Sequence, residues 1–258
     1  MAHLCHAGRR GTLCGGIGCG FVKQVRQKSC SSIFTKIPMI TDKQSYNFST
    51  RTGVFTLAVI GLWAFWCFLM ATWPQFFAHS TTRAIARVFI VFIPAVVFYL
   101  TGNRRKHILD YFLLRKNWMY GAILGFGTAV LYFSLYLSFN FDFRQGSFHI
   151  PTGFAIWFNF ILGSPLAEEA FFRGVLLQEL RHTLGTTWAT IVSAFAFALL
   201  HLPQWLILDH QPGIELLSSF ATIFIYGIVF ALFVNLTRSL WASLIPHWIN
   251  NFILLAMS

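Results

Sequence analysis

Long apolar stretches alternate with short polar ones along most of the chain, and each apolar stretch is close to the length needed to cross a membrane. A helix needs about 20 mainly apolar residues to span the hydrocarbon core of a bilayer. The stretches that approach or exceed this length are 53–73, 84–100, 118–139, 152–183, 188–202, 214–235 and 240–257. The pattern predicts an all-α, polytopic membrane helical bundle with about 6–8 transmembrane helices.

Proline, glycine and polar residues predict where these helices begin and end. Pro74 follows the first stretch, and 152–183 is too long for one simple span. Pro165 is expected to kink or break that stretch just before two adjacent carboxylates, because proline cannot donate a helical hydrogen bond. We expect turns or loops at 184–187, 203–213 and 237–239, and an interruption of the last helix at Pro246.

Two segments between the spans are polar. Residues 108–116 are short, basic and amphipathic, which is typical of a helix lying in the membrane interface. Residues 140–151 are predicted to form a polar loop. The stretch 118–139 contains Gly121, Gly125 and Gly127, which favour close packing against another helix.

Composition agrees with a multi-pass integral membrane protein. The 258 residues are 56% hydrophobic and 10% charged, whereas an ordinary soluble domain is roughly 25% charged. The net charge of +11 comes mainly from basic clusters before residue 52 and within 104–116, and both clusters flank apolar spans. This placement follows the positive-inside rule and argues against nucleic-acid binding. A bacterial inner membrane or an organelle membrane is the expected location.

The amino-terminal part differs from the rest of the chain. Residues 1–41 contain no acidic residue and lack a long apolar core, which excludes a secretory signal peptide. They are either an organelle transit peptide or, as we favour, sequence that precedes a true start at Met39. The expected organisation is a basic disordered leader at 1–50, transmembrane helices with the basic interfacial segment at 51–150, and a catalytic helical core at 151–258. The five cysteines show no disulfide or zinc-site spacing.

Two adjacent carboxylates and an arginine lie inside one apolar stretch. The chain has eight acidic residues in all, and two of them are Glu168 and Glu169. Ionisable groups at bilayer depth are costly and mark a functional site by default. Glu169 and Arg173 are four residues apart, so they share a helix face and can pair. Glu168 points about 100° away, and we expect it to be free for chemistry.

Three further polar residues lie in apolar helices. His201 ends one helix, and His247 and Asn251 share a face of another. At 1.5 Å per residue, Glu168 and His201 lie at a similar depth, roughly 22–25 Å from the turn between them. His247 lies only roughly 14 Å from its own turn, so convergence requires a deeper second turn or a displaced last helix. A carboxylate, two histidines and an amide would suffice to activate water and stabilise an oxyanion.

These three motifs, over about residues 150–258, resemble those of the CAAX protease and bacteriocin-processing (CPBP, or Abi) family. That family is similar to the type II CAAX prenyl protease. The resemblance implies that Glu168 activates water together with His201, and that His247 and Asn251 stabilise the oxyanion. It makes Glu169 and Arg173 supporting or structural residues. The expected enzyme is a CAAX-type intramembrane endopeptidase, a hydrolase whose substrate is a membrane-anchored, prenylated or peptide molecule among membrane lipids.

Several points stay open at the level of sequence. No cofactor is certain; zinc is an alternative, with Glu168, His201 and His247 as its ligands, although no HExxH motif is present. A non-catalytic immunity or scaffold protein that binds a peptide is one rival function, and a proton-coupled transporter is another. Basic segments favour a cytoplasmic amino terminus, which places the carboxylates in the opposite half of the bilayer, whereas the resemblance favours the cytosolic side.

Overall fold

The structure is a computed structural model of the chain, and it describes residues 50–101, 107–140, 150, 152–158 and 163–256. The predicted leader lies outside the described residues, apart from its last residue, and so does most of the predicted loop at 140–151. Four of the five cysteines also lie outside them, while Cys67 is a half-buried free thiol. The helices described below belong to the compact unit Ser45–Ser258.

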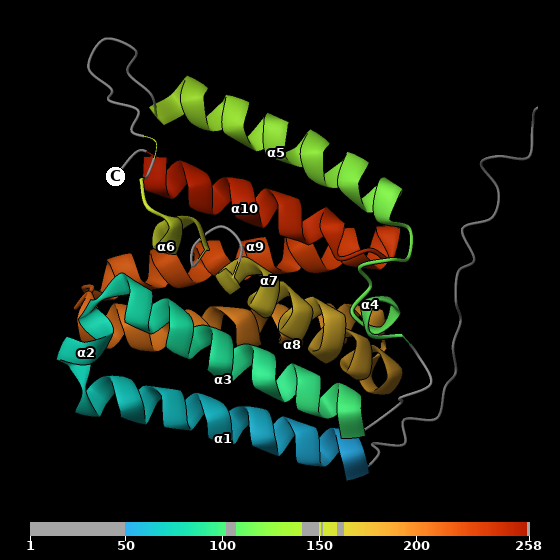
Figure 1. Cartoon of the computed structure of the whole chain (residues 1–258), viewed down its shortest axis with the longest axis horizontal. Helices are drawn as coiled ribbons and strands as arrows, with labels where there is room; N and C mark the ends of the chain where they lie inside the picture. Colours follow the sequence, from blue (N-terminus) through green and yellow to red (C-terminus); the bar gives the residue numbers. More distant parts are fainter. Residues whose placement is uncertain (1–49, 102–106, 141–149, 151, 159–162, 257–258) are drawn as a thin grey trace, which may run out of the picture. The chain divides into compact units, whose positions relative to one another are not determined.

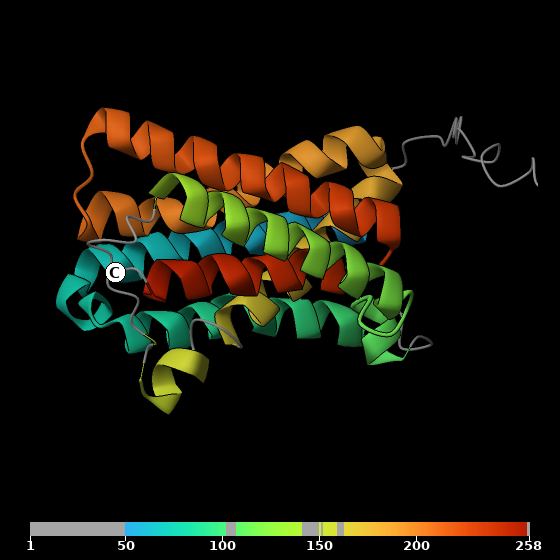
Figure 2. The same cartoon turned by 90° about the horizontal axis from the view of Figure 1, so that it is seen from above.

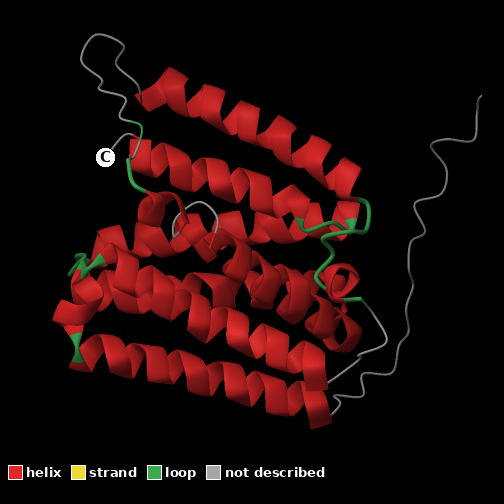
Figure 3. Cartoon of the chain, in the orientation of Figure 1, coloured by secondary structure: helices red, strands yellow, loops and turns green. Residues whose placement is uncertain are grey.

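The described part of the chain is helical and contains no strand (Figures 1 and 3). The first half comprises α1 (Thr50–Thr72), α2 (Pro74–Ala78), α3 (Ser80–Thr101), α4 (Ile108–Tyr111) and α5 (Trp118–Asn140). The second half comprises α6 (Phe154–Ile156), α7 (Ser164–Glu169), η2 (Ala170–Leu176), α8 (Leu177–Pro203), η3 (Gln204–Leu208), α9 (Gly213–Thr237) and α10 (Trp241–Ala256), where η denotes a π-helix. The predicted all-α class is confirmed.

Five helical stretches of the described chain are long and apolar enough to cross a membrane, which confirms a helical membrane bundle. They are Gly53–Thr72, Thr81–Thr101, Trp118–Ser138, Ser164–Leu208 and Gly213–Thr237. The stretch Ser164–Leu208 has 45 residues and is broken at Gly185, whose φ of 76° is not helical. The predicted turn at 184–187 is therefore confirmed, and this stretch supplies two antiparallel segments (Figure 1).

Close packing between helix pairs positions the second half of the chain. α8 packs along α9, and α5 packs along α10 (Figures 1 and 2). A Cβ added to Gly227 of α9 would lie 2.9 Å from the Cα of Ala194 on α8. A Cβ added to Gly125 of α5 would lie 2.8 Å from the Trp241 carbonyl oxygen. The glycines thus permit helix contacts that any side chain would prevent.

The prediction of an interfacial helix over residues 108–116 is wrong, because the helix found there is much shorter. Only Ile108–Tyr111 is helical, and Leu113 and Asn117 have left-handed φ values of 58° and 48°. The segment after α4 instead binds the turn before α10. The Leu240 N–H donates to the Leu113 carbonyl at 2.9 Å, and Asn117 Nδ2 donates to the Thr237 carbonyl at 2.9 Å. These tertiary hydrogen bonds replace those of a longer helix.

The prolines behave differently from one another. Pro165 lies in the first turn of α7, where its missing N–H costs nothing, so a helix begins there as expected. The predicted loop at 203–213 is wrong in its first half, because α8 runs through Pro203 and continues as η3 to Leu208. A π-helical turn accommodates the missing donor. α10 also continues through Pro246 rather than being interrupted there.

Candidate active site

Glu168 and Glu169 end α7, and both side chains are buried. Glu169 Oε1 lies 3.1 Å from Arg173 Nη1, and both side chains are fully inaccessible to solvent. The predicted pairing of these two residues is therefore confirmed. The Arg173 guanidinium also lies 4.2 Å from the centre of the Phe197 ring and 5.6 Å from that of Phe230. Aromatic faces favour a desolvated cation, so this buried arginine is stabilised on several sides.

Glu168 is not free, contrary to expectation. Its Oε1 lies 3.3 Å from Arg87 Nη1 and accepts a hydrogen bond from Ser164 Oγ at 2.8 Å. A second carboxylate in this interior needs its own cation, because an unpaired buried charge is very costly. Within the described chain no hydrogen bond ends at Oε2, and the nearest basic atom recorded for it is His247 Nε2 at 3.8 Å. One oxygen is therefore anchored, and the other faces the cavity.

Arg87 connects α3 both to Glu168 and to the residue that begins η3. Its Nη1 contacts Glu168, and its Nη2 donates to Gln204 Oε1 at 3.0 Å. Gln204 begins η3, directly after the helix that carries His201. A helix from the first half of the chain thereby holds the Glu168 carboxylate against the end of α8.

His247 contacts both carboxylates, so the predicted convergence occurs. Its Nδ1 lies 3.0 Å from Glu169 Oε1, and its Nε2 lies 3.8 Å from Glu168 Oε2. The contacts that hold the turn before α10 against residues 113–117, and the close approach of α5 at Gly125, position α10 for this contact. If Nδ1 donates its proton to Glu169, Nε2 is the nitrogen directed at Glu168.

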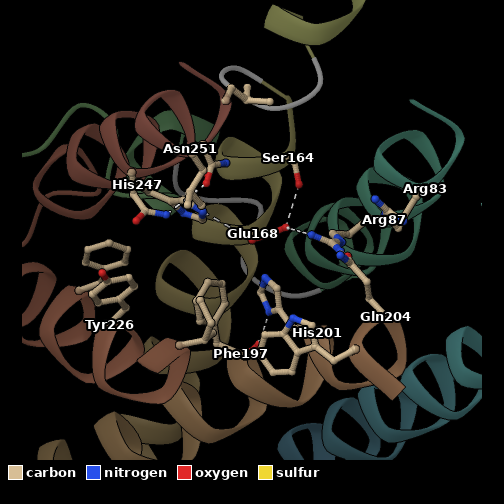
Figure 4. Close-up of a pocket in the computed structure, with 16 residues that line it drawn as sticks. Arg83, Arg87, Ser164, Glu168, Phe197, His201, Gln204, Tyr226, His247 and Asn251 are labelled. Carbon is tan, nitrogen blue, oxygen red and sulfur yellow. Dashed lines mark hydrogen bonds and ion pairs between the residues drawn. The ribbon is translucent and has the colours of Figure 1, made fainter. Parts of the chain in front are cut away.

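His201 has a defined tautomer in this arrangement. Its Nδ1 lies 3.0 Å from the Phe197 carbonyl oxygen, which can only accept a hydrogen bond. Nδ1 therefore carries the proton, and Nε2 of the neutral ring is an acceptor. The imidazole stacks on Trp205, with ring centres 5.7 Å apart. His201 and Glu168 face the same cavity from different helices (Figure 4).

Asn251 lies at the end of a polar chain that crosses three helices. Tyr226 on α9 donates its hydroxyl hydrogen to the Tyr132 hydroxyl oxygen of α5 at 3.2 Å. Tyr132 in turn donates to Asn250 Oδ1 at 3.0 Å, and Asn250 Nδ2 donates to Asn251 Oδ1 at 3.5 Å. With its oxygen engaged in this way, the Asn251 amide is oriented with its N–H groups on the opposite side.

The predicted residues Glu168, His201, His247 and Asn251 line one cavity of about 340 Å³ (Figure 4). Glu169 and Arg173 lie behind it and do not line it. Its lining combines charged and polar side chains with aromatic and aliphatic ones. Its other lining residues are Arg83, Arg87, Ser164, Phe197, Gln204, Trp205, Ile223, Tyr226, Phe230, Asn250, Leu254 and Leu255.

The side chains as arranged do not fit a zinc centre. Among the described residues, no three His, Cys, Asp or Glu side chains are spaced to hold a metal ion. The Arg87 guanidinium also lies 3.3 Å from the carboxylate that such an ion would need. A cation held at that position repels a second one.

Sequence reasoning missed Ser164, Arg87, Arg83 and Gln204 as parts of the site. A signal was present for the arginines, because Arg83 and Arg87 are four residues apart within an apolar span and share a helix face. Charged residues within a membrane span mark a functional site by default.

Comparison with known proteins relates part of the chain to one family. No curated protein and no solved structure matches the chain. Residues 150–253 match the family model described as type II CAAX prenyl endopeptidase Rce1-like. The matched range contains Glu168, His201, His247 and Asn251, but none of the residues contributed by α3 and α5. The part of the chain that carries these four residues is therefore similar to the Rce1-like type II CAAX prenyl endopeptidases, in agreement with the resemblance in its motifs.

Proposed function

We propose that the protein is an intramembrane endopeptidase that hydrolyses a peptide bond through a water molecule activated by Glu168 and His201. The observation that supports this most strongly is the half-anchored carboxylate of Glu168. Ser164 and Arg87 hold Oε1, while Oε2 faces a cavity shared with two histidines. A positioned carboxylate of this kind can accept a proton from water.

The reaction follows from the positions of these groups. Water bound between Glu168 Oε2 and His201 Nε2 gives a proton to the carboxylate, and its oxygen forms a bond to the carbonyl carbon of the substrate. The electron pair of the carbonyl moves onto its oxygen. When the tetrahedral intermediate collapses, the carbon–nitrogen bond breaks and the proton held by Glu168 passes to the departing nitrogen. The products are a new carboxyl group and a new amine.

His247 and Asn251 are placed to stabilise the oxyanion. The Asn251 amide donates through Nδ2, and His247 donates through Nε2 when both of its nitrogens carry protons. Glu169 stabilises that doubly protonated ring through its 3.0 Å contact with Nδ1. Glu169 and Arg173 thus act through His247 rather than on the substrate.

The substrate we propose is a membrane-associated peptide or protein, of the CAAX prenyl type that the family description names. The cavity lining combines charged side chains with apolar ones, among them Phe230, Leu254 and Leu255. A peptide that carries an apolar group would fit this combination. The bundle itself has the spans of an integral membrane protein.

A matched pair of glutamate variants tests this function. Wild type, Glu168→Gln and Glu215→Gln are reconstituted in liposomes with a library of membrane-anchored peptides, and the products are identified by mass spectrometry. Loss of a general base costs roughly 10²- to 10⁴-fold in rate, so Glu168→Gln should cut at least about 100-fold more slowly than wild type. Glu215 is exposed in the first turn of α9, and its variant should retain the wild-type rate.

Equal cleavage by wild type and Glu168→Gln would rule out the proposed mechanism. Biological activity that survives Glu168→Gln without any cleavage would instead favour a peptide-binding immunity or scaffold protein. Proton-coupled uptake into the same liposomes would favour a transporter.

A further inference from the structure

The helix that carries His201 contains a proline two residues later, and this proline frees one backbone carbonyl. Pro203 lies inside α8 and has no N–H group. In an α-helix the N–H at position 203 would donate to the carbonyl of Leu199, four residues before it. That carbonyl lies two positions before His201, so it belongs to the turn of helix from which the His201 imidazole projects.

A side chain from α1 supplies a donor to this carbonyl. The indole Nε1–H of Trp63 donates to the Leu199 carbonyl oxygen at 2.8 Å, across 136 positions of sequence. Trp63 lies in the middle of the candidate span Gly53–Thr72, where lipid offers no polar partner. One contact therefore satisfies both the indole N–H and the freed carbonyl, and it joins α1 to α8.

This contact is not a general accompaniment of prolines in these helices. Pro94 lies inside α3 and Pro246 inside α10. Over the residues that the structure describes, no side-chain donor is recorded for the carbonyl four positions before either proline. The interior also does not supply a partner for every indole. Trp66 is fully buried on the same helix as Trp63, and its Nε1 has no hydrogen-bond partner among the described residues.

The end of α8 is held on both sides of His201. Arg87 of α3 donates to Gln204 Oε1 at 3.0 Å, three residues after His201, and Trp63 binds the chain two residues before it. His201 and Gln204 both face the cavity (Figure 4). The His201 ring is also held by its own helix, because Nδ1 lies 3.0 Å from the Phe197 carbonyl oxygen. A shift of this turn would therefore move the imidazole with it.

We propose that Trp63 is a positioning residue for the hydrolysis, because it binds the carbonyl that Pro203 frees and so fixes the turn of α8 that presents His201 to the cavity. This inference rests on the proposed role of His201 together with Glu168. Trp63 does not line the cavity that contains Glu168, so it acts on the reaction through α8. A misplacement of about 1 Å can lower a rate roughly 100-fold, so one contact of this kind can affect the chemical step.

Removal of a single N–H group tests the proposal. Trp63→Phe keeps an aromatic ring but cannot donate, and its rates are compared with those of wild type in liposomes, per mole of folded protein, with a membrane-anchored peptide. We expect kcat to fall roughly 10-fold while KM changes by less than about 2-fold, because substrate binding is kept and His201 is misplaced. Trp66→Phe is the matched control. It removes an indole N–H that has no recorded partner in the described chain, and it should keep the wild-type kcat.

A second substitution separates the effect of the N–H group from that of the ring. Pro203→Ala restores a backbone N–H that can donate to the Leu199 carbonyl. In the Pro203→Ala background, the loss of kcat caused by Trp63→Phe should therefore fall from roughly 10-fold to about one-fold. An equal loss in both backgrounds, or no loss in either, would overturn the positioning role.

A spectroscopic measurement keeps this inference separate from the proposed function. In protein with ¹⁵N-labelled histidine, the His201 side-chain signals are assigned by comparison with His201→Gln. They should shift in Trp63→Phe and return in the double variant with Pro203→Ala, whereas Trp66→Phe should leave them in place. A change in the folded fraction alters the intensity of these signals but not their frequency. His201 signals that are identical in all variants would overturn the inference, whereas absence of cleavage by wild type would overturn the hydrolysis alone.

Discussion

Glu168 and Glu169 are adjacent in sequence but have different surroundings and different roles. Glu169 is fully buried behind the cavity between Arg173 and His247, so its charge is used to hold side chains together. Glu168 lines the cavity and keeps Oε2 directed into it. Adjacent helical residues point about 100° apart, which lets one turn of helix supply both a structural carboxylate and the one proposed to react.

The buried Glu169–Arg173 pair makes a prediction about stability. Removing one partner of a buried ion pair leaves the other charge uncompensated and costs about 3–5 kcal/mol. Arg173→Met should therefore lower the free energy of unfolding in detergent by about that amount. Both residues are fully inaccessible, so solvent does not screen the effect.

The double variant Glu169→Gln, Arg173→Met provides the control for this prediction. Because neither residue is then charged, it should be clearly more stable than Arg173→Met alone. A single variant as stable as the double variant would show that the pair does not hold the helix in place.

At the scale of elements, the π-helix η2 directly follows the two carboxylates. π-helical turns inside α-helices are frequent at functional sites, and they leave carbonyl groups that need other partners. Here Ser193 Oγ donates to the Phe172 carbonyl at 2.9 Å, and Gln178 Nε2 donates to the Arg173 carbonyl at 3.3 Å. The first of these bonds ties η2 to α8, which carries His201, and so links the segments that carry the two residues proposed to activate water.

The close contact between α8 and α9 makes a second stability prediction. In Gly227→Ala the new Cβ would meet the Ala194 backbone at 2.9 Å, so the helices must separate. Overpacking of this kind typically costs about 1–3 kcal/mol. The thermal unfolding midpoint in detergent should fall, and cleavage should fall with it, since Arg173 Nη2 also donates to the Gly227 carbonyl at 3.4 Å.

Gly127→Ala is the matched control, because a Cβ at Gly127 would meet nothing within 4 Å. This variant should keep an unfolding midpoint at or above that of wild type, since alanine favours the helix. An equal loss of stability in both variants would contradict this prediction, because a Cβ at Gly127 makes no contact like that with Ala194.

The helices themselves could largely be predicted from sequence, because apolar length and turn residues are local signals. Pro74, Gly185 and the turn at Arg238, whose φ is 57°, all lie where helices were expected to end. The errors occurred where tertiary contacts override local signals. The segment after α4 bonds to the start of α10, and the helix through Pro203 continues because it can adopt π-helical geometry.

The site could be predicted only in part for a related reason. A spacing of four residues placed Glu169 beside Arg173, and His247 on the same face as Asn251. Nothing local shows that Arg87 on α3, 81 positions away in sequence, contacts Glu168. Such a contact depends on how helices pack, which periodicity does not specify.

At the scale of the whole molecule, the matched family region is not self-sufficient. Residues 150–253 match the family, but α3 supplies Arg87 to the carboxylate, and α5 supplies Tyr132 to the chain of hydrogen bonds that ends at Asn251. Large apolar side chains such as Leu57, Ile123 and Leu236 are exposed on the long helices, as expected for surfaces that face lipid. The amino-terminal spans therefore both anchor the protein and complete the site.

Hydrolysis in ¹⁸O-labelled water tests the central claim most directly. Wild type and Glu168→Gln are incubated in liposomes with a membrane-anchored peptide, with and without a chelator. The mass of the product is then measured by mass spectrometry. We predict one ¹⁸O atom in the new carboxyl group, an unchanged rate with chelator, and a rate for Glu168→Gln at least about 100-fold below that of wild type. Product from Glu168→Gln at the wild-type rate, or product that chelator removes and zinc restores, would contradict the account.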